Sequence, residues 1–174
     1  NKDATASLGV FMNYAHAGNG ILIDEIIKGG PLDKSKINVK AGMIIADVLG
    51  GGGYYSEILN SLVGPNGKVY LHNNKAYMPY VEKELVARLA NNRLEHVIRH
   101  DRETDALDFT ANNFDVMFFV LGYHDLYHTS DGWSVNKDDF IKQVTTALKA
   151  KGKLVIVDHS AKAGSGIEFS QELH

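Results

Sequence analysis

Met43 to Tyr55 reads M-I-I-A-D-V-L-G-G-G-G-Y-Y, and this stretch decides the fold. An apolar run leads to an aspartate, Asp47, and then to four consecutive glycines, Gly50 to Gly53, before a helical pattern begins. The order predicts a strand, a tight turn and a helix. Such a turn exposes bare backbone and directs the positive end of a helix dipole toward a nucleotide-like ligand.

The composition is that of one ordinary domain. The chain has 174 residues, a formal net charge of -3 and 44% hydrophobic residues. It is long enough to bury a core and has no basic excess that would attract nucleic acid, so we expect no nucleic-acid partner. Because cysteine is absent, disulfides, thiolate metal sites and thiol catalysis are excluded. No run approaches the ~18 apolar residues that span a bilayer, so we expect no membrane partner and a cytoplasmic location by default.

Strand and helix patterns alternate along most of the chain. The expected strands are Met43–Val48, Lys68–Leu71, Leu94–Ile98, Phe114–Leu121 and Leu154–Val157. The expected helices carry apolar stripes at Tyr55, Ile58, Leu59 and Leu62, at Val81, Leu85 and Leu89, and at Phe140, Val144 and Leu148. This alternation implies right-handed crossovers and an α/β three-layer fold with a parallel sheet.

The first 37 residues look different from the rest. Ile21 to Ile27 has isoleucines at helical spacing, and Gly29-Gly30-Pro31 ends the pattern. We therefore expect residues 1–37 to be an extension containing a helix that packs on the core, and residues 38–174 to be the ligand-binding domain.

Polar clusters follow each expected strand. In an open parallel sheet the ligand lies beyond the C-terminal ends of the strands, near the switch in strand order. The clusters that should meet there are Asp47–Gly53, His72–Asn74, His100–Glu103, Gly122–His128 and Asp158–Ser160.

Four segments of the sequence, in this order, carry a resemblance to a known family. They are D-V-L-G-G-G-G-Y-Y-S from Asp47, G-P-N-G-K-V-Y from Gly64, N-N-F-D-V-M-F-F-V-L-G-Y-H-D from Asn112 and G-K-L-V-I-V-D-H from Gly152. The chain resembles class I S-adenosylmethionine-dependent methyltransferases over about residues 38 to 168. More narrowly, it is similar to a bacterial group known mainly as predicted methyltransferases. The resemblance implies a Rossmann-like fold, S-adenosyl-L-methionine as cofactor, and methyl transfer to an unidentified small-molecule acceptor.

The resemblance also implies roles for individual residues. The methionine end of the cofactor would be held by Asp47 and the glycines Gly50, Gly51, Gly52 and Gly53, where a Cβ would block close approach. Asn73 would meet the ribose. Asp101 would contact the adenine, with Glu103 as its competitor. The site of methyl transfer would be lined by Leu121, Gly122, Tyr123 and His124, and Tyr123 and His128 are the expected acceptor contacts.

His124 is the expected general base. An oxygen or nitrogen acceptor often needs its proton removed, and an imidazole with a pKa near ~6.5 suits that task. Asp125 or His128 would orient His124 or share the task. The structural alternatives are that Asp125 is a helix N-cap and that His124 is an ordinary loop residue. His124, His128 and His159 with Asp125 and Asp158 also form a candidate metal cluster, but no zinc or iron signature is met and we expect no metal.

The chain departs from the family pattern in three places. Leu49 stands where the family at large has its first glycine. Asn73 replaces the usual acid at the ribose, so we expect weaker cofactor binding. Only Ala161 to His174 follows the expected fifth strand, where the family usually adds two more strands. The fifth strand would then be an exposed edge of the sheet. We expect either that the chain is a shortened form or that a second copy covers this edge, which would make a homo-oligomer.

Two other functions share the same strand-turn-helix. An NAD-dependent oxidoreductase would need a third glycine at the position of Ser56 and an acid at the position of Asn73. A catalytically degenerate subunit would bind S-adenosylmethionine without turning it over.

Overall fold

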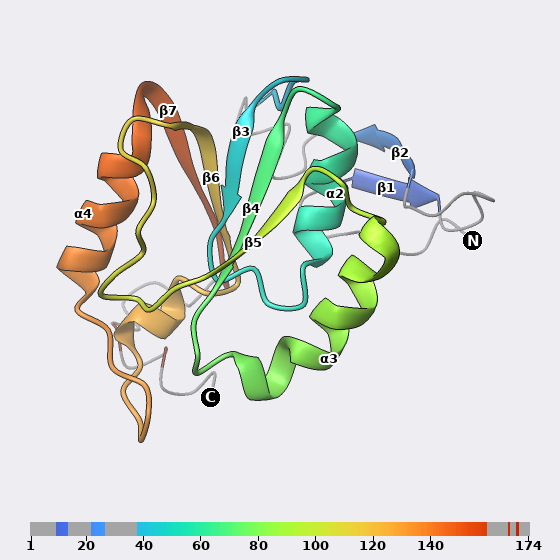
Figure 1. Cartoon of the computed structure of the whole chain (residues 1–174). Helices are drawn as coiled ribbons and strands as arrows, with labels where there is room; N and C mark the ends of the chain where they lie inside the picture. The colour runs from blue at the N-terminus through green and yellow to red at the C-terminus, as the bar shows by residue number, and fades with distance from the viewer. Residues whose placement is uncertain (1–9, 14–21, 27–37, 160–166, 168–169, 171–174) are drawn as a thin grey trace.

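Five parallel strands lie between two layers of helices in the computed structural model (Figure 1). The structure describes residues 10–13, 22–26, 38–159, 167 and 170. The strands of the sheet are β3 (Ile44–Asp47), β4 (Lys68–Asn73), β5 (Val97–Asp101), β6 (Phe114–Val120) and β7 (Leu148–Val157). The helices are α2 (Tyr54–Val63), α3 (Met78–Leu89) and α4 (Lys137–Ala147), with short 3₁₀ helices η1 (Ala90–Asn92) and η2 (His124–Tyr127). The predicted α/β three-layer fold is confirmed.

Alternation along the strands divides the core between the two faces of the sheet. Ile45 and Phe118 belong to the cluster that packs under α2, whereas their neighbours Ala46 and Phe119 belong to the cluster under α4. Successive side chains of a strand point to opposite faces, so a strand that is apolar throughout must be covered on both sides. Figure 1 shows that cover, with α4 on one face and α2 and α3 on the other.

The strand order β5-β4-β3-β6-β7 places the switch point between β3 and β6. The chain runs outward from β3 through β4 to β5, and then crosses back to β6 and β7. The turns that follow β3 and β6 both contain a leucine with positive φ, 51° at Leu49 and 56° at Leu121. These turns meet, because a Cβ built on Gly122 would lie 3.6 Å from the Cβ of Leu49. The predicted edge of the sheet for ligand binding is therefore formed by these two turns.

The bounds of some predicted elements differ from the structure. The third strand begins at Val97 and continues through polar residues to Asp101, which an edge strand tolerates because its residues are exposed or only half-buried. Leu148 does not continue the α4 stripe: it has extended backbone and begins β7.

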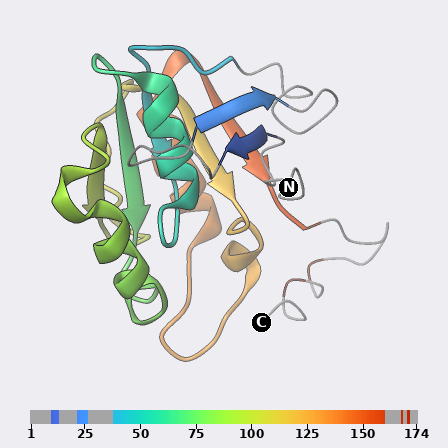
Figure 2. The ribbon, with the colours of Figure 1, turned by 90° about the vertical axis from the view of Figure 1, so that its right-hand side faces the viewer.

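The predicted helix at Ile21–Ile27 is wrong. Leu22–Ile26 is strand β2, and it pairs antiparallel with strand β1 (Val10–Asn13). Isoleucine-rich segments favour strands, and so short a segment gains more from ladder hydrogen bonds than from a helix of fewer than two turns. The hairpin lies beside α2 (Figure 2). The division of the chain at residue 38 stays a prediction.

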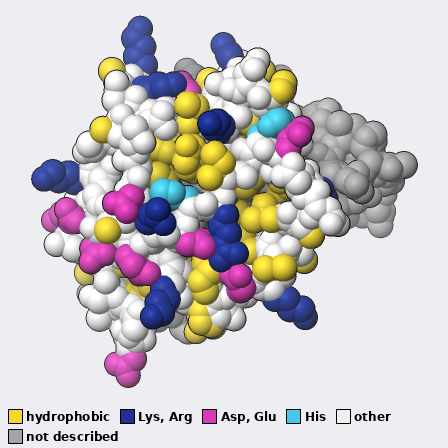
Figure 3. Space-filling view, in the orientation of Figure 1, with side chains coloured by type: hydrophobic (Ala, Val, Ile, Leu, Met, Phe, Trp, Pro, Cys, Tyr) yellow, Lys and Arg dark blue, Asp and Glu magenta, His cyan; other side chains and the backbone are white. Residues whose placement is uncertain are grey.

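Charged side chains of both signs are interspersed on the face viewed in Figure 3. Among the residues that the structure describes, no helix has the length and apolar character needed to cross a membrane.

Candidate functional site

The glycine turn after β3 is fastened to the end of β4. Asn73 forms two hydrogen bonds with Gly51: its Nδ2 donates to the Gly51 carbonyl at 2.8 Å, and its Oδ1 accepts from the Gly51 N–H at 2.9 Å. The Gly50 N–H donates to the carbonyl of His72 at 2.9 Å. Asn73 is buried and braces the turn, which differs from the ribose contact expected from the sequence. An amide suits this place because it donates and accepts at once, which an ionised carboxylate cannot do.

Asp47 lies directly beneath the turn and is completely buried. Its Oδ2 accepts a hydrogen bond from the Ser56 hydroxyl at 2.7 Å, but its Oδ1 has no hydrogen-bond partner among the described residues. Burial raises the pKa of Asp47 to about 6, and the hydrogen bonds from Ser56 only partly oppose it. A Cβ at Gly50 would lie 2.7 Å from the Asp47 carboxyl carbon, so only glycine fits above the carboxylate.

The upper surface of the turn is open at Gly51. A Cβ built there would meet only Val81, at 3.9 Å, whereas Gly53 has a φ of 80° and its Cβ would crowd Leu71 at 2.8 Å. Gly51 also has a positive φ, 58°. The turn therefore needs glycine for its conformation and presents backbone to whatever lies above Gly51.

His72 joins the glycine turn to the loop after β5. Its Nδ1 accepts from the Leu49 N–H at 3.3 Å, so Nε2 carries the proton and donates to the Arg102 carbonyl at 3.1 Å. Burial lowers the pKa of His72 to about 4, with a smaller contribution from His100. His72 is thus a neutral structural imidazole at physiological pH.

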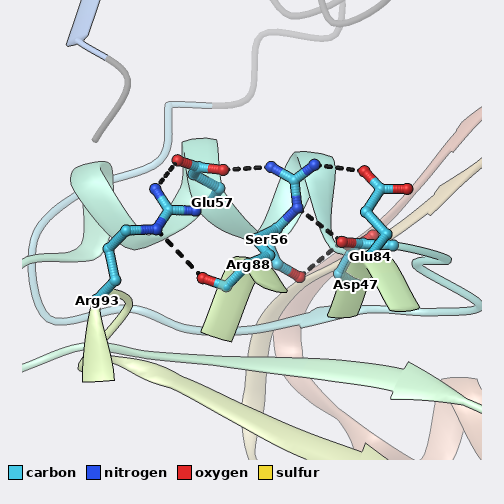
Figure 4. A network of polar contacts seen from close by, with 7 residues as sticks. Asp47, Ser56, Glu57, Glu84, Arg88 and Arg93 are labelled. Carbon is cyan, nitrogen blue, oxygen red and sulfur yellow. Dashed lines mark hydrogen bonds and ion pairs between the residues drawn. The ribbon is translucent and has the colours of Figure 1, made fainter. Parts of the chain in front are cut away.

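Arg88 reaches from α3 across the glycine turn (Figure 4). Its Nε donates to the Gly52 carbonyl at 2.7 Å, and its other nitrogens pair with Glu57 and with Glu84. Glu57 is buried and also pairs with Arg93, so two guanidinium groups face one carboxylate. The Arg88 side chain is only 15% exposed, because its guanidinium group packs against Glu57 of α2. That partner could not be found from helical periodicity, because Glu57 lies 31 residues away.

A cavity of about 410 Å³ opens beyond β4 and β5. It is lined by Asn74, Lys75, Ala76, Glu103, Thr104, Gly132, Trp133, Ser134 and Val135. Of the two expected adenine contacts, Glu103 lines this cavity, and its Oε1 accepts from the Lys75 N–H at 3.2 Å. Asp101 lies outside it, with its carboxylate 2.6 Å from Arg99 on the surface.

A second cavity, of about 520 Å³, shares Ala76, Gly132 and Trp133 with the first. Its remaining lining residues are Tyr77, Tyr80, Val81, Asp125, His128, Ser130 and Asp131. Tyr77 and Trp133 are in ring contact, with centroids 5.6 Å apart, where the two cavities adjoin. Among the described residues, this lining contains the rings of two tyrosines and one tryptophan, two carboxylates, and no lysine or arginine.

His124 is not among the residues that line this cavity, and it lies between two carboxylates. Its Nδ1 is 2.7 Å from Asp158 Oδ1 and its Nε2 is 3.3 Å from Asp125 Oδ1. The other oxygen of Asp125 accepts the hydroxyl hydrogen of Tyr77. Burial and the adjacent Asp125 raise the pKa of Tyr77, which stays a donor. The structure therefore brings together His124 and Asp125 as expected, and adds Asp158 and Tyr77.

Of the other residues expected after β6, Leu121, Gly122 and Tyr123 are not among those that line the cavity. Tyr123 packs its ring on Phe119 and its hydroxyl lies 3.0 Å from that of Tyr127, so it does not line the cavity. Leu121 is 45% exposed, and Gly122 is buried against Phe119. His128 lines the cavity, as an acceptor contact should.

The candidate metal cluster is only partly assembled. Among the described residues, ligand atoms of His124, Asp158 and His159 lie within 4.8 Å of one another, while His128 and Asp125 are not in this group. Asp158 already accepts from the backbone N–H groups of His124, at 2.9 Å, and of His159, at 2.7 Å. Its oxygens are occupied as hydrogen-bond acceptors, and we propose no metal there.

Comparison with known proteins points in one direction. No family model matches the chain. It is 28% identical over 139 residues to the ubiquinone/menaquinone biosynthesis C-methyltransferase UbiE of Hahella chejuensis, a match that covers 79% of this chain and 51% of that protein. The chain spans about half the length of the curated relatives it matches.

Solved structures share its fold. A SAM-dependent methyltransferase from Aquifex aeolicus superposes with a TM-score of 0.60 and 22% identity, over 78% of this chain and 68% of that one. A SAM-dependent O-methyltransferase from Thermotoga maritima gives a TM-score of 0.54 and 20% identity, over 83% of this chain and 48% of that one.

Proposed function

Because the chain is related in sequence and in fold to the class I S-adenosylmethionine-dependent methyltransferases, as its motifs predict, we propose that it transfers a methyl group from S-adenosyl-L-methionine to a small-molecule acceptor. One observation carries the proposal: the buried Asp47 has an unpartnered oxygen beneath an open glycine turn. An ammonium group, such as the one at the amino-acid end of this cofactor, would satisfy that oxygen.

The residues around the turn fit the cofactor. Asp47 and Gly51 would hold its amino-acid end, and the cavity of about 410 Å³ next to Asn74 and Glu103 has room for its nucleoside. We assign the ribose to Asn74, since Asn73 is engaged with the turn, and the adenine to Glu103. When bound, the cofactor supplies a methyl group on a positively charged sulfur, so alignment does much of the catalytic work.

The second cavity would hold the acceptor. Its aromatic side chains Tyr77, Tyr80 and Trp133 suit a planar ring, and its described lining residues include no lysine or arginine that would favour a strongly anionic ligand. The related UbiE proteins are named for C-methylation in ubiquinone and menaquinone biosynthesis. We therefore propose a ring carbon of a quinone precursor as the first acceptor to test.

Thermal shift separates the candidate functions. We expect S-adenosylmethionine and its demethylated product to raise Tm, and NAD to leave it unchanged. Ligand at 100 times its Kd stabilises by ~2.7 kcal/mol. A shift with NAD alone would overturn the proposal in favour of the oxidoreductase alternative.

Turnover separates an enzyme from a degenerate subunit. We expect incorporation of labelled methyl groups from S-adenosylmethionine into a reduced quinone precursor, measured by scintillation and mass spectrometry. Cofactor binding without turnover on carbon, oxygen or nitrogen acceptors would favour the degenerate subunit.

A further inference from the structure

Four titratable side chains form a continuous line across three loops. Tyr77, after β4, donates its hydroxyl to Asp125 Oδ2. The other oxygen of Asp125, after β6, lies 3.3 Å from His124 Nε2. The Nδ1 of His124 lies 2.7 Å from Asp158, after β7. Each member touches the next, and Tyr77 and Asp125 line the second cavity, whereas His124 and Asp158 are not among its lining residues.

The order of this line decides which group can meet an acceptor. Asp125 lines the cavity of about 520 Å³, whereas His124 is not among its lining residues. We propose that Asp125 is the proton-accepting group at the acceptor, and that Asp158 is a positioning residue that acts through His124. The proposal rests on the proposed methyltransferase function and deepens it, because it reverses the order of base and orienter expected from the sequence.

Asp158 is built to hold an imidazole in one orientation. It accepts hydrogen bonds from the His124 N–H at 2.9 Å and from the His159 N–H at 2.7 Å, besides the contact with the His124 ring. Burial alone would raise the pKa of Asp158, but these hydrogen bonds together hold it below its usual value. An ionised carboxylate at Nδ1 fixes the tautomer with the proton on that nitrogen, as an orienting carboxylate does in other catalytic pairs.

The groups around His124 then act as one proton-holding unit. Asp158 and His159, after β7, and Asp125, from η2, face His124. The ring centroids of His159 and His124 are 5.2 Å apart. When the acceptor X–H bond breaks, its proton goes to the Asp125 carboxylate, whose buried Oδ1 faces His124 Nε2, and the methyl group takes the place of that proton on X. Tyr77 keeps its own proton and holds Asp125 Oδ2.

Asp158→Asn tests the positioning role, with Asp115→Asn as its control. Asp115 is also a part-buried acceptor, bonded to the Ile44 N–H at 2.9 Å and to Lys149 at 2.8 Å, but it lies at the opposite end of the sheet. We expect Asp158→Asn to lower kcat by about 100-fold, a typical contribution of a positioned acid–base group, with KM and product-cofactor Kd unchanged. Asp115→Asn should leave kcat unchanged. Equal kcat in wild type and Asp158→Asn would overturn the proposal.

Nitrogen-15 NMR of ligand-free protein gives a readout that needs no turnover. In wild type we expect the His124 Nδ1 to carry a proton at pH 7, and in Asp158→Asn we expect a mixture of tautomers. A wild-type His124 with an unprotonated Nδ1 would overturn the positioning role even if the variant failed to fold. Calorimetry with the product cofactor tests the proposed function separately, because its failure would leave the NMR result standing.

Asp125→Asn against His124→Gln tests the order of the line. With Asp125 at the acceptor, Asp125→Asn removes the proton acceptor, whereas His124→Gln removes only its support. We expect kcat to fall further in Asp125→Asn. The reverse ranking would put His124 at the acceptor and overturn this part of the proposal.

Discussion

At the scale of the residue, Asp47 combines full burial with an ionisable group. Its pKa of about 6 lies above the ordinary value because burial disfavours the charge. In the ligand-free protein the folded state therefore binds more protons than the unfolded state between about pH 4 and 6, and this group's contribution to stability falls as pH rises through that window. A bound ammonium would reverse the preference by favouring the carboxylate.

Cofactor affinity should consequently depend on pH. We expect the association constant of the product cofactor, measured by calorimetry, to fall about tenfold between pH 7 and pH 5, which is one unit below the pKa of Asp47. Asp47→Asn is the control and should bind weakly with no change across this window. His72 does not interfere, because its pKa of about 4 keeps it neutral at pH 5. If the association constant of the wild type does not change between pH 7 and pH 5, Asp47 does not bind the cofactor.

At the scale of the element, Glu57 ties α2 to the chain around α3. The Glu57 side chain is 4% exposed, and its partners Arg88 and Arg93 are 15% and 24% exposed. Arg88 also holds the Gly52 carbonyl, so the ion pairs reach the glycine turn (Figure 4). Removing one partner of a buried ion pair leaves the others without compensation, which is more costly than losing a surface pair.

Glu57→Ala should therefore destabilise the fold by about 3 kcal/mol, or about 6–12 °C in Tm, as measured by calorimetric or circular-dichroism melting. Glu82→Ala is the matched control, because Glu82 pairs with Arg99 at 2.6 Å on the exposed side of α3. The control should melt with the wild type. If the two variants melt together, the Glu57 cluster does not anchor the helices.

At the scale of the whole molecule, β7 is the outermost strand of the sheet on the β6 side. Among the described residues no strand pairs with its outer edge. The Leu121 N–H donates to the Val157 carbonyl, so Val157 faces β6 and Ile156 directs its backbone groups outward. An outward row of N–H and C=O groups is a template for another strand. The homo-oligomer expected from the sequence stays a prediction.

The variant Ile156→Pro tests whether the outer edge of β7 forms a homo-oligomer. We expect the wild-type chain to associate with rising concentration in light scattering, and Ile156→Pro to stay monomeric, because proline removes the outward N–H without breaking the ladder with β6. Ile156→Val keeps that N–H and should still associate. A wild-type monomer at every concentration would contradict the edge contact.

The sequence by itself determined the architecture, because its signals are local. The glycines Gly50–Gly53, between an apolar run and a helical stripe, indicate a strand, a turn and a helix. The largely apolar strands Ile44–Asp47 and Phe114–Val120 require cover on both faces of the sheet. The hairpin at Leu22–Ile26 was mispredicted because its partner, Val10–Asn13, is not visible in the spacing of its own isoleucines.

Only the tertiary structure decided which polar groups meet. Asp158 lies 34 residues from His124 in the sequence, and no pattern in either segment predicts that their side chains are in contact. Asn73 braces Gly51, and Glu103 rather than Asp101 lines the cavity, because strand register and loop path set the side chains that follow each strand. Local spacing determines where strands end, but long-range packing determines the partners of the residues beyond those ends.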